Sequence, residues 1–243
     1  MSTSEPSIAP TSSLHNAVDI VVAPGAAFER IRRVPGWGWV FLIATVLAIL
    51  GSLLSLPAST HAFGLSAPAL YAPIVAKMPP EKQSEALAQM IKVGGVMNSL
   101  EALFLPVGLL LGSLISAVIM LIANAVSRGD GTFKRFFALS MALTIITSLG
   151  LVLNGLITLV RGPSSYETII SVKTALPNLA LVVPGAGGKL LTFLGVLNIA
   201  SIWATVLTAL GMMAVGNVKP LVAWTAAVAS LLVAAGLAAA FTP

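Results

Sequence analysis

The sequence predicts an all-α, polytopic membrane protein: a bundle of five transmembrane helices preceded by a short helix in the membrane interface. Composition is the first reason, because 57% of the 243 residues are hydrophobic and only 9% are charged, against about 25% charged residues in soluble domains. The second reason is that five long runs lack any fully charged residue, and each exceeds the roughly 18 apolar residues typical of a spanning helix. These runs cover residues 36–76, 102–127, 136–160, 190–218 and 220–243.

The N-terminal residues 1–18 are rich in Ser, Thr and Pro, and we expect a disordered tail ahead of a five-span membrane domain at 19–243. The tail lacks the basic segment and the apolar core of a secretory signal. Just before Pro35, Phe28 and Ile31 share one helical face while charged residues cover the others. This pattern predicts a short amphipathic helix lying flat, with its apolar face in lipid and its arginines at phosphate level.

The first predicted span covers residues 37–56 and opens with two tryptophans, which are typical of the aromatic belt at a membrane surface. The apolar stretch that follows, 62–76, is interrupted by Pro68 and Pro73. We expect this stretch to be re-entrant or to pack over the helix ends. The charged segment after it is amphipathic and is predicted to form a helix that runs on into the second span, 102–127.

Three further spans complete the predicted bundle, at 136–160, 190–215 and 221–241. A tight polar loop precedes the third span, and a hairpin turn joins the fourth to the fifth. The connection between the third and fourth spans contains a second proline-containing apolar stretch, 175–184, which could also be re-entrant.

The basic residues predict the orientation of the bundle. With a cytoplasmic N-terminus, the cytoplasmic side holds seven Lys and Arg residues and the opposite side holds six. Arginine alone splits five to one towards the cytoplasm, and these residues lie in short loops, where the positive-inside rule applies. We therefore predict that the N-terminus is cytoplasmic.

The spans contain few of the groups that catalysis or ion coupling requires. No Asp, Glu, Lys, Arg or His lies inside a predicted span, there is no Cys, and His15 and His61 fall in the tail and a linker. Hydrolysis within a membrane needs a nucleophile with a base, or two carboxylates, at one depth. Metal sites need several ligands, and ion-driven carriers usually keep an ionisable residue in the membrane. We expect no enzyme activity, no metal, no cofactor and no nucleic-acid partner.

Small and polar residues within the spans are candidates for helix packing or partner contact. Gly108 and Gly112 form a Gly-x-x-x-Gly pair just after Pro106, and such pairs let helix backbones approach closely. Asn124, Asn154 and Asn198 are expected to face other helices. Two alternatives stay open for these residues: packing within one bundle, or contact with a second copy or another membrane-protein subunit.

The basic residues on the predicted cytoplasmic side are candidates for binding anionic lipid headgroups, each contributing about 1 kcal/mol. The alternative is that they only set the topology. These candidates are Arg30, Arg32, Arg33, Arg128, Lys134 and Arg135.

Three segments resemble prokaryotic members of the Yip family, which is named for eukaryotic relatives that bind Ypt/Rab GTPases. Residues 23–31, followed by Pro35 and Trp39, are similar to the start of these proteins. Residues 131–137 resemble the glycine–phenylalanine–basic sequence before their third span. Residues 202–207, which include Trp203, resemble their fourth span. The resemblance implies a bacterial inner membrane location and marks Trp203 as a further packing or contact candidate.

The resemblance implies a protein that organises the membrane or serves as an accessory subunit of a larger membrane transport complex. The alternative is a transporter or channel for a neutral or lipidic solute. A cavity through the bundle, lined by Asn124, Asn154 and Asn198, would favour transport. A packed bundle with an exposed face of small residues would favour the subunit.

Overall fold

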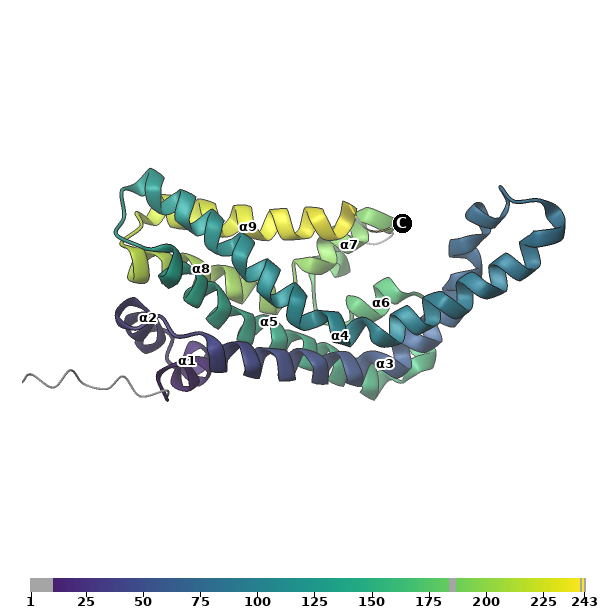
Figure 1. The fold of residues 1–243 in the computed structure, drawn as a ribbon, viewed down its shortest axis with the longest axis horizontal. Coiled ribbons are helices and arrows are strands. Elements are labelled where there is room, and N and C mark those ends of the chain that lie inside the picture. The colour runs from purple at the N-terminus through teal and green to yellow at the C-terminus, as the bar shows by residue number, and fades with distance from the viewer. Residues whose placement is uncertain (1–10, 184–186, 241, 243) are drawn as a thin grey trace, which may run out of the picture. The chain divides into compact units, whose positions relative to one another are not determined.

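The computed structural model describes residues 11–183, 187–240 and 242 and confirms the all-α fold (Figure 1). Five of its helices are long and apolar enough to cross a membrane, as predicted. These are α3 (Gly38–Val75), α4 (Pro80–Ser127), α5 (Phe133–Arg161), α8 (Ile199–Gly216) and α9 (Pro220–Ala240). The shorter elements are α1 (Thr11–Val22), α2 (Pro24–Arg33), α6 (Ile169–Lys173) and α7 (Gly188–Val196), with 3₁₀ turns η1 (Pro163–Ser165) and η2 (Leu179–Val182).

The chain divides into two compact units, and the longest helices contribute to both. Unit 1 holds the residues up to Thr45 together with Leu109–Thr147 and Trp203–Ser230. It therefore contains α1, α2, the loop between α4 and α5, and the turn between α8 and α9. Unit 2 holds Val46–Gly108, Ser148–Ile202 and the residues from Leu231 onward, so it contains the turn between α3 and α4 as well as α6 and α7.

A helix, α1, stands where the sequence predicts the last part of a disordered tail. Ala17 and Ile20 of α1 are buried, and Asp19 accepts an ion-paired hydrogen bond from Arg30 of α2 at 2.7 Å. These contacts explain why residues 11–18 are ordered. Residues 1–10 of the predicted tail lie outside the described part of the chain.

The short amphipathic helix is present as α2, but its apolar face does not lie in lipid. Phe28 and Ile31 are 3% and 0% exposed. A Cβ added at Gly211 of α8 would come 3.1 Å from the Phe28 ring and 2.6 Å from Leu139 of α5. The predicted lipid-facing side is therefore buried within unit 1, where α1 and α2 lie side by side (Figure 1).

The proline-interrupted stretch after the first span is helical. α3 continues through Pro57, Pro68 and Pro73, and α4 begins at Pro80, so the two helices form a long hairpin (Figure 1). α3 has 38 residues and α4 has 48, whereas about 20 residues suffice to cross the hydrocarbon core. Both helices therefore extend well beyond one membrane crossing.

The fourth span starts later than predicted, because the chain breaks between α7 and α8. The Asn198 carboxamide oxygen accepts from the backbone N–H groups of Ala200 and Ser201, both at 3.0 Å. Asn198 thus caps the start of α8, and residues 190–196 belong to a separate short helix. The second apolar stretch, 175–184, contains η2; Pro184 lies outside the described residues.

Candidate functional site

The six basic residues predicted to bind headgroups all belong to unit 1, and we call them the basic face. Three segments supply it: α2, the loop after α4, and the first turn of α5. Its members are Arg30, Arg32, Arg33, Arg128, Lys134 and Arg135.

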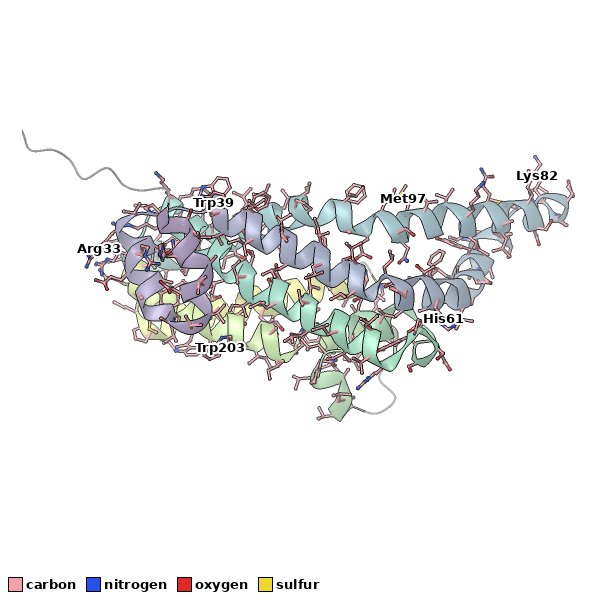
Figure 2. The ribbon with its side chains drawn as sticks, turned by 90° about the horizontal axis from the view of Figure 1, so that it is seen from below. Arg33, Trp39, His61, Lys82, Met97 and Trp203 are labelled. Carbon is pink, nitrogen blue, oxygen red and sulfur yellow. The ribbon has the colours of Figure 1, made fainter. Side chains whose placement is uncertain are left out.

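The arginines of α2 are committed to partners within the chain. Arg30 donates to Asp19 at 2.7 Å and to Asn16 at 2.9 Å, which ties α2 to α1. Arg33, which is labelled in Figure 2, pairs with Glu29 one turn earlier on the same helix, and both side chains are exposed. These two guanidinium groups are therefore partly neutralised.

Asp130 links the three segments of the basic face. Its carboxylate accepts from Arg32 of α2 at 3.2 Å and from the Asn217 amide of the α8–α9 turn at 2.9 Å. Its backbone N–H donates to the Gly216 carbonyl at 2.9 Å, and its carbonyl accepts from Arg135 at 3.3 Å. The sequence identifies Asp130 only as a turn residue, because its partners lie far away along the chain.

The side chain of Asn124, in unit 1, holds the loop between α4 and α5 in place through hydrogen bonds. Its amide nitrogen donates to the carbonyls of Gly129 at 3.3 Å and Gly131 at 3.2 Å, and its oxygen accepts from the Gly131 N–H at 3.1 Å. The buried ring of Phe136 packs so closely on Gly131 and Gly216 that an added Cβ at Gly216 would lie 2.5 Å from it. Asn124 therefore holds a loop to the end of its own helix.

Arg128 and Lys134 differ from the other members of the basic face, because both are exposed and neither makes an ion pair with a described residue. Arg128 follows the last turn of α4 with φ of 57°, in the left-handed region that favours glycine. The Gly129 N–H then donates back to the Asn124 carbonyl at 2.9 Å, which completes the helix end. A charged side chain thus occupies a position where glycine would be less strained.

The other two candidate asparagines also close loops, in unit 2. Asn154 donates to the Val172 carbonyl at 2.9 Å and accepts from the Leu176 N–H at 2.8 Å, so it fixes the segment around α6. Asn198 caps α8 as described above. Asn154 lines a cavity, but neither Asn124 nor Asn198 is among the residues that line it.

The Gly-x-x-x-Gly pair faces outward instead of packing inside the chain. An added Cβ at Gly108 or Gly112 would meet no described atom within 4 Å, and nearby Pro106 is partly exposed. Packing within the bundle is therefore the wrong role for these glycines, while contact with a partner stays a prediction. Trp203 is 46% exposed on α8, so it is not a buried packing residue either (Figure 2).

A close contact between α3 and α5 involves two glycines that the sequence did not single out. An added Cβ at Gly51 of α3 would lie 2.5 Å from the Leu151 carbonyl carbon of α5. One at Gly155 would lie 2.6 Å from the Gly51 carbonyl oxygen and 2.7 Å from the Leu54 Cβ. Single glycines on two helices produce no repeated spacing that could reveal this contact.

The part of the hairpin beyond the first span, residues 60–100, is here called the hairpin arm. Its two helices pack where Gly94 of α4 meets Phe63 and Tyr71 of α3, whose ring centroids are 6.5 Å apart. The α4 side carries charges from Glu81 to Lys92, and such residues do not lie in the hydrocarbon core. The arm is therefore expected to lie outside that core.

The hairpin arm nevertheless exposes large apolar side chains. Val93, Val96 and Met97 are 52%, 50% and 55% exposed, and Met97 and Lys82 mark the arm in Figure 2. A groove of about 550 Å³ lies between the helices. Its apolar lining includes Tyr71, Ile74, Met78, Met90, Val93 and Met97. Exposed apolar side chains gathered in one groove make it a candidate interaction site.

The family model of the Yip1 domain matches residues 18–242. The chain belongs to the Yip1 family. It is 27% identical over 217 residues to "Membrane protein YknW" from Bacillus subtilis (strain 168), a match that covers 86% of this chain and 82% of the relative. No solved structure matches.

This Yip1-family protein is therefore an integral, multi-pass membrane protein, and the resemblance noted in its sequence is confirmed. The family match includes α2, the 128–132 loop and the hairpin arm. Within residues 11–183, 187–240 and 242, no three or more His, Cys, Asp or Glu side chains gather to hold a metal ion.

Proposed function

We propose that this Yip1-family protein is a non-enzymatic accessory subunit of a larger membrane complex and that it contacts its partner through the hairpin arm. The observation that carries this proposal is the exposed apolar groove on an arm whose charged residues keep it out of the hydrocarbon core. An apolar groove outside the hydrocarbon core has no lipid tails to cover it, which favours a protein partner.

The chemistry of the groove supports a protein partner. Met78, Met90 and Met97 supply flexible, polarizable side chains, which adapt to varied apolar partners. An amphipathic helix laid in such a groove buries apolar anchors at intervals of three or four residues. With the N-terminus in the cytoplasm of a bacterial inner membrane, the arm would meet this partner on the opposite side.

The basic face has a second role in this proposal, as a contact with anionic lipid on the cytoplasmic side. Arg128 and Lys134 are the residues suited to it, since the arginines of α2 already have acidic or amide partners. Each exposed basic residue near a membrane surface contributes about 1 kcal/mol.

Co-purification from native membranes in a mild detergent tests the accessory role. We expect the wild-type chain to retain a discrete protein in a fixed ratio. The double variant Val93→Glu, Met97→Glu should elute without that protein, because it places two charges in the groove. Ser84→Glu adds a charge at an exposed polar position of the same helix and serves as the control. Equal retention by the double variant, or no retained protein in the wild type, would reject the proposal.

A further inference from the structure

A cavity of about 180 Å³ with several polar side chains in its lining lies within unit 2, among α3, α4, α5 and α6, and the hairpin-arm proposal makes no use of it. Its volume equals roughly six water molecules at about 30 Å³ each. The polar groups of its lining include Ser52, Ser55, Ser59, Asn98, Glu101 and Lys173. Three serines one helical turn apart place a polar stripe on an otherwise apolar stretch of α3.

The deep wall of the cavity is held in place by hydrogen bonds. Asn154 lines it, is 8% exposed, and bonds both to the Val172 carbonyl and to the Leu176 N–H. Ser55 donates to the Gly51 carbonyl at 3.1 Å. These groups already have partners, so they shape the cavity and do not need a ligand.

Other groups of the lining have unused hydrogen-bonding capacity. The hydroxyls of Ser52 and Ser59 bond to no described residue. The Asn98 amide nitrogen is buried and has no acceptor among the described residues, which is unfavourable. If the cavity held a hydrogen-bond acceptor, rotation of the Asn98 side chain would let its amide nitrogen donate to that acceptor.

One ion pair marks the mouth of the cavity. Lys173 Nζ donates to Glu101 Oε1 at 2.7 Å, and the two side chains are 55% and 46% exposed. The ammonium group keeps two further donors and the carboxylate keeps further acceptor sites. Because the two charges cancel, an anion or a cation bound here would leave one charge unbalanced, whereas a zwitterion would not.

The sequence places this mouth at the boundary of the membrane. Glu101 is the last charged residue before the apolar run 102–127, and lipid headgroups lie just outside the hydrocarbon core. We propose that the cavity binds a zwitterionic phosphate–amine group, with phosphate oxygens accepting from Asn98, Ser59 and Lys173 and the ammonium group donating to Glu101. A phospholipid headgroup and free phosphoethanolamine share this chemistry.

Native mass spectrometry of the purified full chain tests the proposal. The detergent-solubilised protein is incubated with equal amounts of phosphatidylethanolamine and phosphatidylglycerol. We expect phosphatidylethanolamine to be retained about tenfold more, the ratio expected from one well-placed hydrogen bond to a charged group. Equal retention of the two lipids, with no binding of free phosphoethanolamine, would overturn the proposal.

Three substitutions distinguish a loss of lipid recognition from a loss of folded structure. Asn98→Leu removes a donor to the phosphate, which both lipids carry, so the retained amount of phosphatidylethanolamine should fall. Glu101→Gln leaves Lys173 unbalanced and should turn the preference towards the anionic phosphatidylglycerol, a reversal that a loss of structure would not produce. Lys92→Gln removes an exposed charge of α4 that does not line the cavity and should change nothing. Unaltered retention of phosphatidylethanolamine in Asn98→Leu, together with an unaltered preference in Glu101→Gln, would overturn the assignment.

A soluble competitor distinguishes the two sources of the ligand. If free phosphoethanolamine displaces phosphatidylethanolamine and glycerol phosphate does not, the site recognises the headgroup of a lipid. If free phosphoethanolamine binds and neither lipid does, the ligand is a solute of the same chemistry. Both results support the proposed chemistry. The outcome also does not depend on a partner in the groove of the hairpin arm, since none of the substituted residues lines that groove.

Discussion

α5 is the most buried of the five helices that could span the membrane, and α4 is the least. In its most apolar window of 18 residues, α5 is 61% buried, whereas α4 is 17% buried. α5 contributes Phe136, Leu139 and Met141 to the core, all at 0% exposure. α4 instead exposes Leu103 and Phe104. The difference separates a helix that holds the fold from a helix that offers its surface to lipid or to another protein.

The largest difference in stability should come from alanine substitutions at two glycines: Gly51, which packs against α5, and Gly108, which lies exposed on α4. Gly51→Ala places a methyl group against the backbone of α5, which must shift, and overpacking of this kind costs about 1–3 kcal/mol. Gly108→Ala on α4 meets open space and should be neutral or stabilise the helix by up to about 1 kcal/mol. Thermal unfolding of both variants in the same detergent measures the difference. Equal losses would mean that α4 packs as tightly as α5.

The second-largest effect should come from Asn124, because hydrogen bonds from its side chain hold the end of α4 to the loop that follows. Asn124→Ala leaves the Gly129 and Gly131 carbonyls and one N–H without their partner. We expect a loss of about 1–3 kcal/mol and faster proteolysis between α4 and α5. Lys134→Ala, at an exposed position nearby, is the control. A variant as resistant to protease as the wild type would contradict this role for Asn124.

The smallest effect comes from the residue that follows α4. Arg128→Gly relieves a left-handed backbone and should stabilise the protein by about 1 kcal/mol. The same change should weaken binding to vesicles that contain anionic lipid by about 1 kcal/mol, roughly fivefold. Arg128→Gly should therefore raise the unfolding temperature and lower the fraction of protein that floats with the vesicles. Unchanged flotation would mean that Arg128 has no part in lipid contact.

Hydropathy and loop composition are enough to predict much of this fold. A charge-free run long enough to cross lipid has few other structures available, because its backbone must bond within itself. The five spans follow from that. The helix α2 follows instead from its pattern of apolar residues on one face and charged residues on the others.

The details that decide function depend on contacts that no local pattern encodes. Lipid is about as apolar as a protein interior, so the sequence of α4 does not say which of its faces packs. Gly108 and Gly112 carry a packing motif and face outward, whereas Gly51 and Gly155 carry none and touch the opposite helix. Pro68 and Pro73 were expected to break a helix that instead continues through them into the hairpin arm.

Site-specific photo-cross-linking in native membranes tests whether the hairpin arm contacts a partner protein. A photoreactive amino acid replaces Met97 in the groove and, as the matched control, Ser84 on the polar side of the same helix. We expect a discrete protein adduct from position 97 that is absent from position 84. Adducts with lipid alone at position 97, or the same protein adducts from both positions, would contradict it.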